Sequence, residues 1–253
     1  MNINSKQVCF LHIPKTGGSY TKHGNKTKQS PVRPITYLGH KFILDSSNDF
    51  DVYDDPIYYK NIGKRAAKAH KGILRETIND KFVFSNIRNI FKWLVSWGGH
   101  VGCWKASHNV GNRHSDYPIA QKGFEYYIKT IANREFPYPS RKFIFAQLFS
   151  TQGDLIVDWI NYTDYLDQDL AALAKFKNLK YVKQNKKRVS GNKDYRQYYT
   201  TDLIDLVYQT WKREIKLFNF NFDNTGKRNK DVTRLIKDSK IKYIWTTNYF
   251  SNS

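Results

Sequence analysis

The chain has 253 residues, 40% of them apolar, which is enough for one large α/β domain or two small ones and excludes global disorder. Lysine and arginine number 42 against 22 aspartates and glutamates, so the formal charge of +20 attracts anions such as nucleic acid, anionic lipid, a phosphorylated cofactor or an acidic glycan. Two cysteines, Cys9 and Cys103, are too few for a disulfide scaffold. No run approaches the roughly 20 apolar residues of a transmembrane segment. The polar start lacks a signal-peptide core, so we expect a soluble, cytoplasmic protein without an anchor.

The first half of the chain predicts two clear strands. Residues 8–13 (VCFLHI) form a short apolar run that leads into Gly17-Gly18, with a helix expected from about residue 19. Residues 30–34 read as a loop, and residues 35–38 and 41–44 as short strands. Residues 81–87 (KFVFSNI) are the second clear strand, followed by a helix over 91–97 that Gly98-Gly99 is expected to end. A further helix is expected over 123–133.

The second half continues the alternation of strands and helices. It predicts a strand over 156–162, an Asp-capped helix to 175, a short strand over 179–182 and a helix over 201–218 capped by Thr201. This alternation implies an α/β fold with a single domain, in which helices flank a mostly parallel central sheet. We place the domain at residues 1–224 and a basic C-terminal extension, able to dock on it, at residues 225–253.

The turn after the first strand has the composition of an anion-binding loop. Gly17 and Gly18 let the backbone approach a ligand, Lys15 supplies a charge, and Thr16 and Ser19 supply hydroxyl donors. A strand, loop and helix in this order form a P-loop-like site with backbone N–H groups directed at the anion. The order is not that of a Walker A loop, because Lys15 precedes the glycines and no leading glycine is present. The loop alone also fits a structural turn with an incidental lysine.

The longer string FLHIPKTGGS at residues 10–19 closely resembles the 5′-phosphosulfate-binding motif of the sulfotransferase superfamily. Members of this superfamily use 3′-phosphoadenosine-5′-phosphosulfate (PAPS), and the nearest branch looks like the carbohydrate sulfotransferases that include the heparan sulfate enzymes. The resemblance implies that Lys15 contacts the 5′-phosphosulfate group. It also implies that the following residues bind the same phosphate, namely Thr16, Gly17, Gly18, Ser19 and Tyr20.

The string FVFSNIRNIFKWLVS at residues 82–96 resembles the second signature of the family, a strand followed by Arg-Asp-Pro-x-x-Arg and a serine on the next helix. Arg88 and Ser96 are eight residues apart, as the family requires, and the resemblance implies that both bind the 3′-phosphate of the cofactor. Asn89-Ile90 replaces Asp-Pro and Trp93 replaces the second arginine, which puts the turn geometry in question more than the phosphate contact. A surface ion pair for Arg88 and an ordinary surface serine for Ser96 are the alternatives.

Later segments extend the resemblance over residues 8–222. In relatives, a basic loop with a glycine covers the 3′-phosphate and adenine, and the matching residues are Arg188, Gly191 and Lys193, although a solvated run of charges fits equally well. The heparan sulfate 2-O branch carries a catalytic histidine in a place similar to that of His70. We therefore expect His70 to be the general base, with a solvent-exposed histidine as the alternative.

Taken together, the resemblance implies a sulfotransferase that moves the sulfuryl group of PAPS to an acceptor hydroxyl, with Lys15 and His70 in catalytic roles and PAP as product. The acceptor is expected to be a glycan or another hydroxyl compound, and the chemistry requires no metal. The histidines and cysteine at 100, 103, 108 and 114 do not have a standard zinc spacing.

Two other functions remain as alternatives. The first is a nucleotide kinase or NTPase, but this sequence lacks the Walker A order and an acidic Mg²⁺ ligand at a strand end, which such an enzyme would need. A nonenzymatic polyanion-binding protein would use the +20 charge but would leave the Lys15 and Arg88 motifs unexplained, which argues against nucleic acid as the partner.

Overall fold

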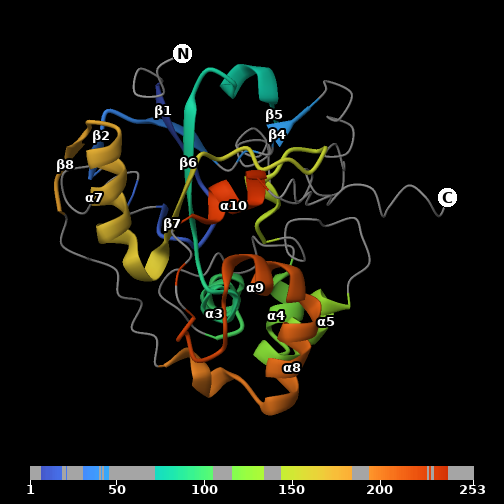
Figure 1. Cartoon of the computed structure of the whole chain (residues 1–253). Helices are drawn as coiled ribbons and strands as arrows, with labels where there is room; N and C mark the ends of the chain where they lie inside the picture. The colour runs from blue at the N-terminus through green and yellow to red at the C-terminus, as the bar shows by residue number, and fades with distance from the viewer. Residues whose placement is uncertain are drawn as a thin grey trace.

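The computed structural model describes residues 7–18, 21, 31–39, 41, 43–45, 72–104, 116–133, 144–183, 194–226, 228 and 231–238. Its central sheet has four strands in the order β3-β1-β6-β7. They are β1 Val8–Leu11, β3 Thr36–Gly39, β6 Phe82–Ile87 and β7 Trp159–Tyr162. Every neighbouring pair is parallel. Helices flank this sheet (Figure 1), so the expected α/β class with a mostly parallel central sheet is confirmed.

Both faces of the central sheet are covered, which explains why β1 and β6 are apolar without alternation. All residues of these two strands are buried. Cys9 and Leu11 face one core, which also contains side chains of α3 Ile90–Val101, α5 Phe124–Ala132, α8 Thr201–Thr210 and α9 Lys212–Phe218. Val8 and Phe10 face a second core with α7 Leu166–Phe176. In Figure 1, α7 accordingly lies apart from the group formed by α3, α5, α8 and α9.

Shorter elements complete the described part of the chain. Two small sheets are formed by the antiparallel pair β2 Val32–Arg33 and β8 Lys180–Tyr181, and by the parallel pair β4 Ile43–Leu44 and β5 Ile73–Leu74. The remaining short helices and 3₁₀ turns are η3 Arg75–Ile78, α4 Tyr117–Ala120, η5 Ala146–Leu148, η6 Thr163–Tyr165, η7 Tyr195–Tyr198 and α10 Val232–Asp238. α10 belongs to the basic extension and buries Val232 and Ile236 in the first core. Among the described helices, none combines the length and apolar character needed to cross a membrane.

The helix after β6 is longer than predicted. α3 does not end at Gly98-Gly99 but continues to Val101, and Gly102 ends it with a φ of 109°. A Cβ on Gly98 would lie 2.9 Å from the Phe124 ring, and one on Gly99 would lie 2.9 Å from the Trp104 ring. The two glycines therefore allow close packing of aromatic rings and do not terminate the helix.

The predicted helix over 201–218 is two helices, α8 and α9, which meet at Trp211. This residue is fully buried and has φ −111° and ψ 26°, outside the helical range. The N-cap is Thr200, not Thr201, and its hydroxyl accepts from the Leu203 N–H at 3.3 Å. Burial of the indole thus interrupts a pattern that reads as continuous in the sequence.

Two smaller predictions also differ from the structure. Within the predicted loop over 30–34, Val32–Arg33 pairs with β8 as a strand, and such long-range pairing leaves no local signal. α7 has no side-chain cap. The Asp169 carboxylate instead accepts from the Tyr162 N–H at 2.8 Å, so it joins the helix to the end of β7.

The order of the strands reverses between β1 and β6. From β1 the chain passes to β3 on one side, and it later returns to β6 on the other side and continues to β7. In open parallel sheets, ligands bind outside the carboxyl ends of the strands at such a switch point. Lys15 follows β1 and Arg88 follows β6, so the fold brings both cationic residues to this point.

Candidate functional site

The loop after β1, residues 14–18, has an unusual backbone conformation. Lys15 has a φ of 64°, a left-handed conformation that costs a non-glycine residue about 1 kcal/mol. Gly17 has a φ of 82°, and a Cβ there would lie 2.8 Å from the Leu166 side chain. Backbone strain of this kind is concentrated at functional sites, where the surrounding structure maintains it.

All five carbonyl oxygens of residues 13–17 accept hydrogen bonds from within the protein. The pairs are Thr16 Oγ1 to Ile13 O at 2.7 Å, Trp93 Nε1 to Pro14 O at 2.8 Å, Arg88 Nη1 to Lys15 O at 3.3 Å, Thr163 Oγ1 to Thr16 O at 3.1 Å, and Thr21 N to Gly17 O at 3.1 Å. By contrast, the backbone N–H groups of Thr16, Gly17 and Gly18 donate to no acceptor within the described residues. The loop therefore directs its carbonyls into the protein and leaves three successive amides without an acceptor among the described residues, and Gly17 is the partly exposed residue of the three. Successive backbone amides of this kind occur in anion-binding loops.

The Thr16 side chain differs from the expectation that its hydroxyl would donate to a ligand. Thr16 is fully buried, and its hydroxyl donates to the carbonyl of Ile13 within the turn. The Thr16 hydroxyl therefore stabilises the turn and does not face solvent. Ser19, the other residue expected to supply a hydroxyl, and Tyr20 lie outside the described residues.

His12 supports the loop from one side. Its Nδ1 lies 2.7 Å from the Tyr37 hydroxyl, and its ring stacks on Phe10 with a centroid distance of 5.7 Å. A Cβ placed on Gly18 would lie 1.7 Å from His12 Nε2. Gly18 is therefore required because the imidazole occupies the space of any side chain at this position.

Arg88 lies directly after β6, beside the loop. It is half-buried, and burial lowers the pKa of its guanidinium group, while the nearby Asp164 carboxylate opposes this shift. Asp164 itself pairs with Lys92 at 2.9 Å. Among the described residues, Arg88 makes one hydrogen bond, from Nη1 to the Lys15 carbonyl, so its other N–H donors can bind an additional acceptor.

Where the chain departs from the second family signature, the residues that replace the family's residues make hydrogen bonds of their own. Asn89, which replaces the aspartate, caps α3 by accepting from the Phe91 N–H at 3.0 Å. Trp93, which replaces the second arginine, holds the Pro14 carbonyl. Ser96 lies three residues further along α3 and is half-buried, but no described residue bonds its hydroxyl. The structure thus joins Lys15 to Arg88 through one hydrogen bond, and among the described contacts none joins either residue to Ser96, which lies on α3.

A line of buried amides crosses the sheet below the loop. Asn86 Nδ2 donates to Thr21 Oγ1 at 2.8 Å, Asn161 Nδ2 donates to Asn86 Oδ1 at 2.9 Å, and Trp159 Nε1 donates to Asn161 Oδ1 at 2.8 Å. Asn86 and Asn161 are register partners in β6 and β7. These bonds fix Thr21, in the first turn after the loop, to the two strands. Sequence reasoning missed them, although an asparagine inside an apolar strand is a usable signal, because buried amides need partners.

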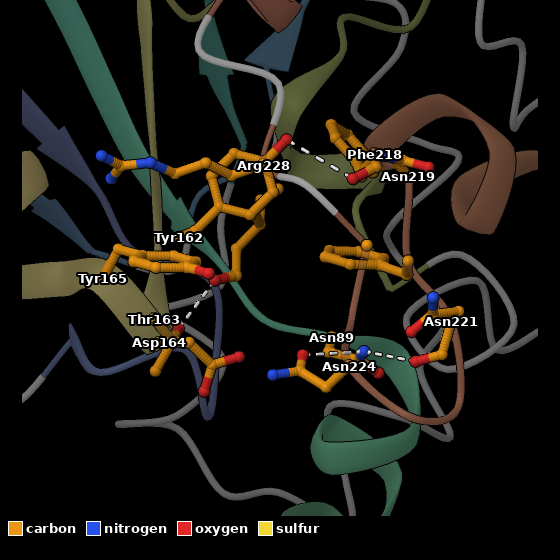
Figure 2. Close-up of a pocket in the computed structure, with 13 residues that line it drawn as sticks. Asn89, Tyr162, Thr163, Asp164, Tyr165, Phe218, Asn219, Asn221, Asn224 and Arg228 are labelled. Atoms are coloured by element: carbon orange, nitrogen blue, oxygen red, sulfur yellow. Dashed lines mark hydrogen bonds between the residues drawn. The ribbon is translucent and has the colours of Figure 1, made fainter.

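A small pocket lies at the carboxyl ends of β6 and β7 (Figure 2). Its lining includes Asn89, Tyr162, Asp164, Asn221 and Arg228. Asn89 Nδ2 donates a hydrogen bond to the Asn221 carbonyl at 2.8 Å, as Figure 2 shows. The cavity volume is ≈ 20 Å³, which holds about one water molecule. It is therefore too small for a nucleotide.

Several predicted site residues lie outside the described part of the chain. They are His70, Ser19, Tyr20, Arg188, Gly191 and Lys193, together with His108 and His114.

Burial raises the pKa of Cys103 to about 12, which keeps its thiol protonated, and no cluster of potential metal ligands occurs among the described residues.

The fold and the loop define an α/β protein with an amide-lined loop at the switch point of a parallel sheet. A scan against protein-family models, a search of curated proteins and a search of solved structures each found no match.

Proposed function

We propose that this protein is a PAPS-dependent sulfotransferase that transfers a sulfuryl group to an acceptor hydroxyl, with a carbohydrate as the expected acceptor. One observation carries the proposal. The carbonyls of the Lys15 loop accept hydrogen bonds from within the protein, the amides of residues 16–18 have no acceptor among the described residues, and the loop contacts Arg88, which directly follows the adjacent parallel strand β6. Two anion-binding groups that follow neighbouring strands suit a nucleotide with phosphates at both its 5′ and 3′ ends.

The chemistry assigns a role to each residue in the site. PAPS supplies the activated sulfuryl group. The amides of residues 16–18 and the Lys15 side chain bind the 5′-phosphate and neutralise the charge that develops on it when the bond to sulfur breaks. Arg88 and Ser96 bind the 3′-phosphate, with Arg188, Gly191 and Lys193 as further contacts. His70 is the proposed base that accepts the proton of the acceptor hydroxyl as its oxygen bonds to sulfur.

Thermal unfolding with PAP, ATP·Mg²⁺ and heparin tests the proposal. PAP at 100 times its Kd should stabilise the protein by about 2.7 kcal/mol, which raises the Tm by several degrees. Lys15→Ala should weaken PAP binding about tenfold to a hundredfold, because hydrogen bonds to charged groups contribute about 1.5–3 kcal/mol.

Lys129→Ala is the matched control, since it removes the same charge from an exposed pair with Glu125 on α5. It should leave PAP binding unchanged. A shift with ATP·Mg²⁺ but not with PAP would indicate a nucleotide kinase or NTPase. Equal shifts with every polyanion and no preference for PAP would indicate a polyanion-binding protein.

A further inference from the structure

Thr163 contacts backbone atoms in both halves of the proposed nucleotide site. It is the first residue of η6, directly after β7. Its hydroxyl lies 3.1 Å from the Thr16 carbonyl in the loop after β1 and 2.7 Å from the Ile87 carbonyl at the end of β6. Ile87 immediately precedes Arg88. One side chain directly after β7 thus connects the loop of Lys15 with the end of β6 that precedes Arg88. Figure 2 shows Thr163 among the residues that line the small pocket at this end of the sheet.

The Thr163 hydroxyl lies between two backbone carbonyls and within hydrogen-bond distance of both. A hydroxyl has one hydrogen, so it donates to one of the two carbonyls at a time and holds both close to the same oxygen. The Thr163 methyl group also lies 3.8 Å from the position that a Cβ on Gly17 would take. Removal of the hydroxyl would leave the Thr16 and Ile87 carbonyls without their shared donor, so the connection between the loop and the end of β6 would depend on the remaining bonds, among them the one from Arg88 to the Lys15 carbonyl.

We propose that Thr163 is a positioning residue that sets the distance between the 5′-phosphate and 3′-phosphate sites, and so determines the preference for nucleotides phosphorylated at both ends. This inference rests on the proposed function. When two binding groups are held at a fixed separation, a ligand that engages both gains affinity through a high effective concentration at the second group. A ligand that engages only one group gains nothing from the fixed separation.

Calorimetric binding of PAP and AMP, which differ only in the 3′-phosphate, tests this role. Thr163→Val, which replaces the hydroxyl with a methyl group of the same shape, should weaken PAP binding about tenfold and change AMP binding by less than about twofold. Thr163→Ser keeps the hydroxyl and should bind both ligands as the unmodified protein does. Thr163→Ala, which cannot overpack, is the second variant and should behave like Thr163→Val.

Two further variants isolate the effect. Thr130→Val removes a hydroxyl that donates to the Tyr126 carbonyl on α5 at 2.8 Å, and it should change neither affinity. Arg88→Ala should reduce PAP binding to the level of AMP, and addition of Thr163→Val to that variant should have no further effect, because the coupled group is gone.

The outcomes separate the inference from the proposed function. Absence of a PAP preference over AMP in the unmodified protein would overturn the proposed function and the inference with it. If the unmodified protein prefers PAP but Thr163→Val leaves this preference intact, the inference alone is overturned. An equal loss for PAP and AMP also overturns it, because that result assigns Thr163 to local support of the loop.

Discussion

At the residue scale, Gly17 and Gly18 serve the same loop for different reasons. Gly17 provides a left-handed backbone conformation with a φ of 82°. Gly18 provides space, because the His12 imidazole occupies the position where a side chain would begin. The imidazole cannot move away at low cost, since it stacks on Phe10 and bonds Tyr37. The packing of His12 and the position of the loop are therefore coupled.

This coupling predicts the effect of Gly18→Ala. The added methyl group overlaps the His12 ring, so the variant should lose about 1–3 kcal/mol of unfolding free energy, the usual cost of overpacking. Urea unfolding measures the loss, and PAP affinity should fall with it. In a His12→Ala background the ring is absent, and the same substitution should have a much smaller effect. Equal effects in both backgrounds would show that the His12 contact is not the cause.

The individual residues of this site could be predicted from the sequence, but the contacts that bring them together could not. Lys15, the glycines and Arg88 lie next to apolar strands, so local patterns identify them. Trp93 contributes through a hydrogen bond to a backbone carbonyl 79 residues away, and the Thr163 hydroxyl contacts backbone carbonyls 147 and 76 residues away. No local pattern encodes such a contact, because the carbonyl that accepts is present at every position of every chain.

At the scale of secondary structure elements, α3 joins the sheet to the C-terminal part of the chain through its cap. Asn89 is 2% exposed, and both polar atoms of its side-chain amide form hydrogen bonds. The Oδ1 atom accepts from the Phe91 N–H at the start of α3, and the Nδ2 atom donates to the Asn221 carbonyl at 2.8 Å. The cap is therefore both local and long-range.

Three substitutions separate these two contributions. Thr200→Ala removes the purely local cap of α8 and should cost about 1 kcal/mol of unfolding free energy. Asn89→Ala removes the cap and the bond to Asn221, so it should cost about 2–3 kcal/mol, measured by urea unfolding. Asn89→Asp keeps the capping oxygen, loses the donor, and should lie between Asn89→Ala and the unmodified protein. An Asn89→Ala cost no larger than that of Thr200→Ala would contradict the long-range role.

Element boundaries were harder to predict than element types. The strands of the sheet could be predicted because apolar residues without alternation indicate burial on both faces. The end of α3 could not, because Gly98 and Gly99 are placed by contacts with Phe124 and Trp104 and not by the helix itself. The break at Trp211 likewise depends on where a large buried ring fits.

At the scale of the whole molecule, an ionic cluster connects segments that are distant in sequence. Arg75, after β5, bonds Asp45 at 3.1 Å and Asp154 at 3.0 Å. Burial alone would raise the pKa of Asp45. Hydrogen bonds from Ser150, Gln152, Arg75 and Thr151 together outweigh it, so the pKa of the carboxyl lies below its ordinary value.

A lowered pKa in the folded protein predicts loss of stability in acid. Asp45 stabilises the fold at pH values above its unfolded pKa of about 4, and this contribution is lost as the pH falls toward the lower folded value. Urea unfolding at pH 7 and pH 3 should therefore show a smaller decrease for Asp45→Asn than for the unmodified protein. Asp80→Asn is the control, because its side chain is 73% exposed and its pair with Lys81 contributes little. Equal pH dependence for all three proteins would contradict the prediction.

The inward bonding of the loop carbonyls has a consequence for how the molecule folds. The donors from Arg88, Trp93 and Thr163 lie 73, 79 and 147 residues along the chain from their acceptors. Closing such long segments is slow relative to local structure, so the loop can adopt its final conformation only after β7 joins the sheet. A synthetic peptide spanning the motif would not reproduce it. In a nascent chain, the site would be completed only when residue 163 has been synthesised and packed, so nucleotide binding reports on the formation of the whole sheet.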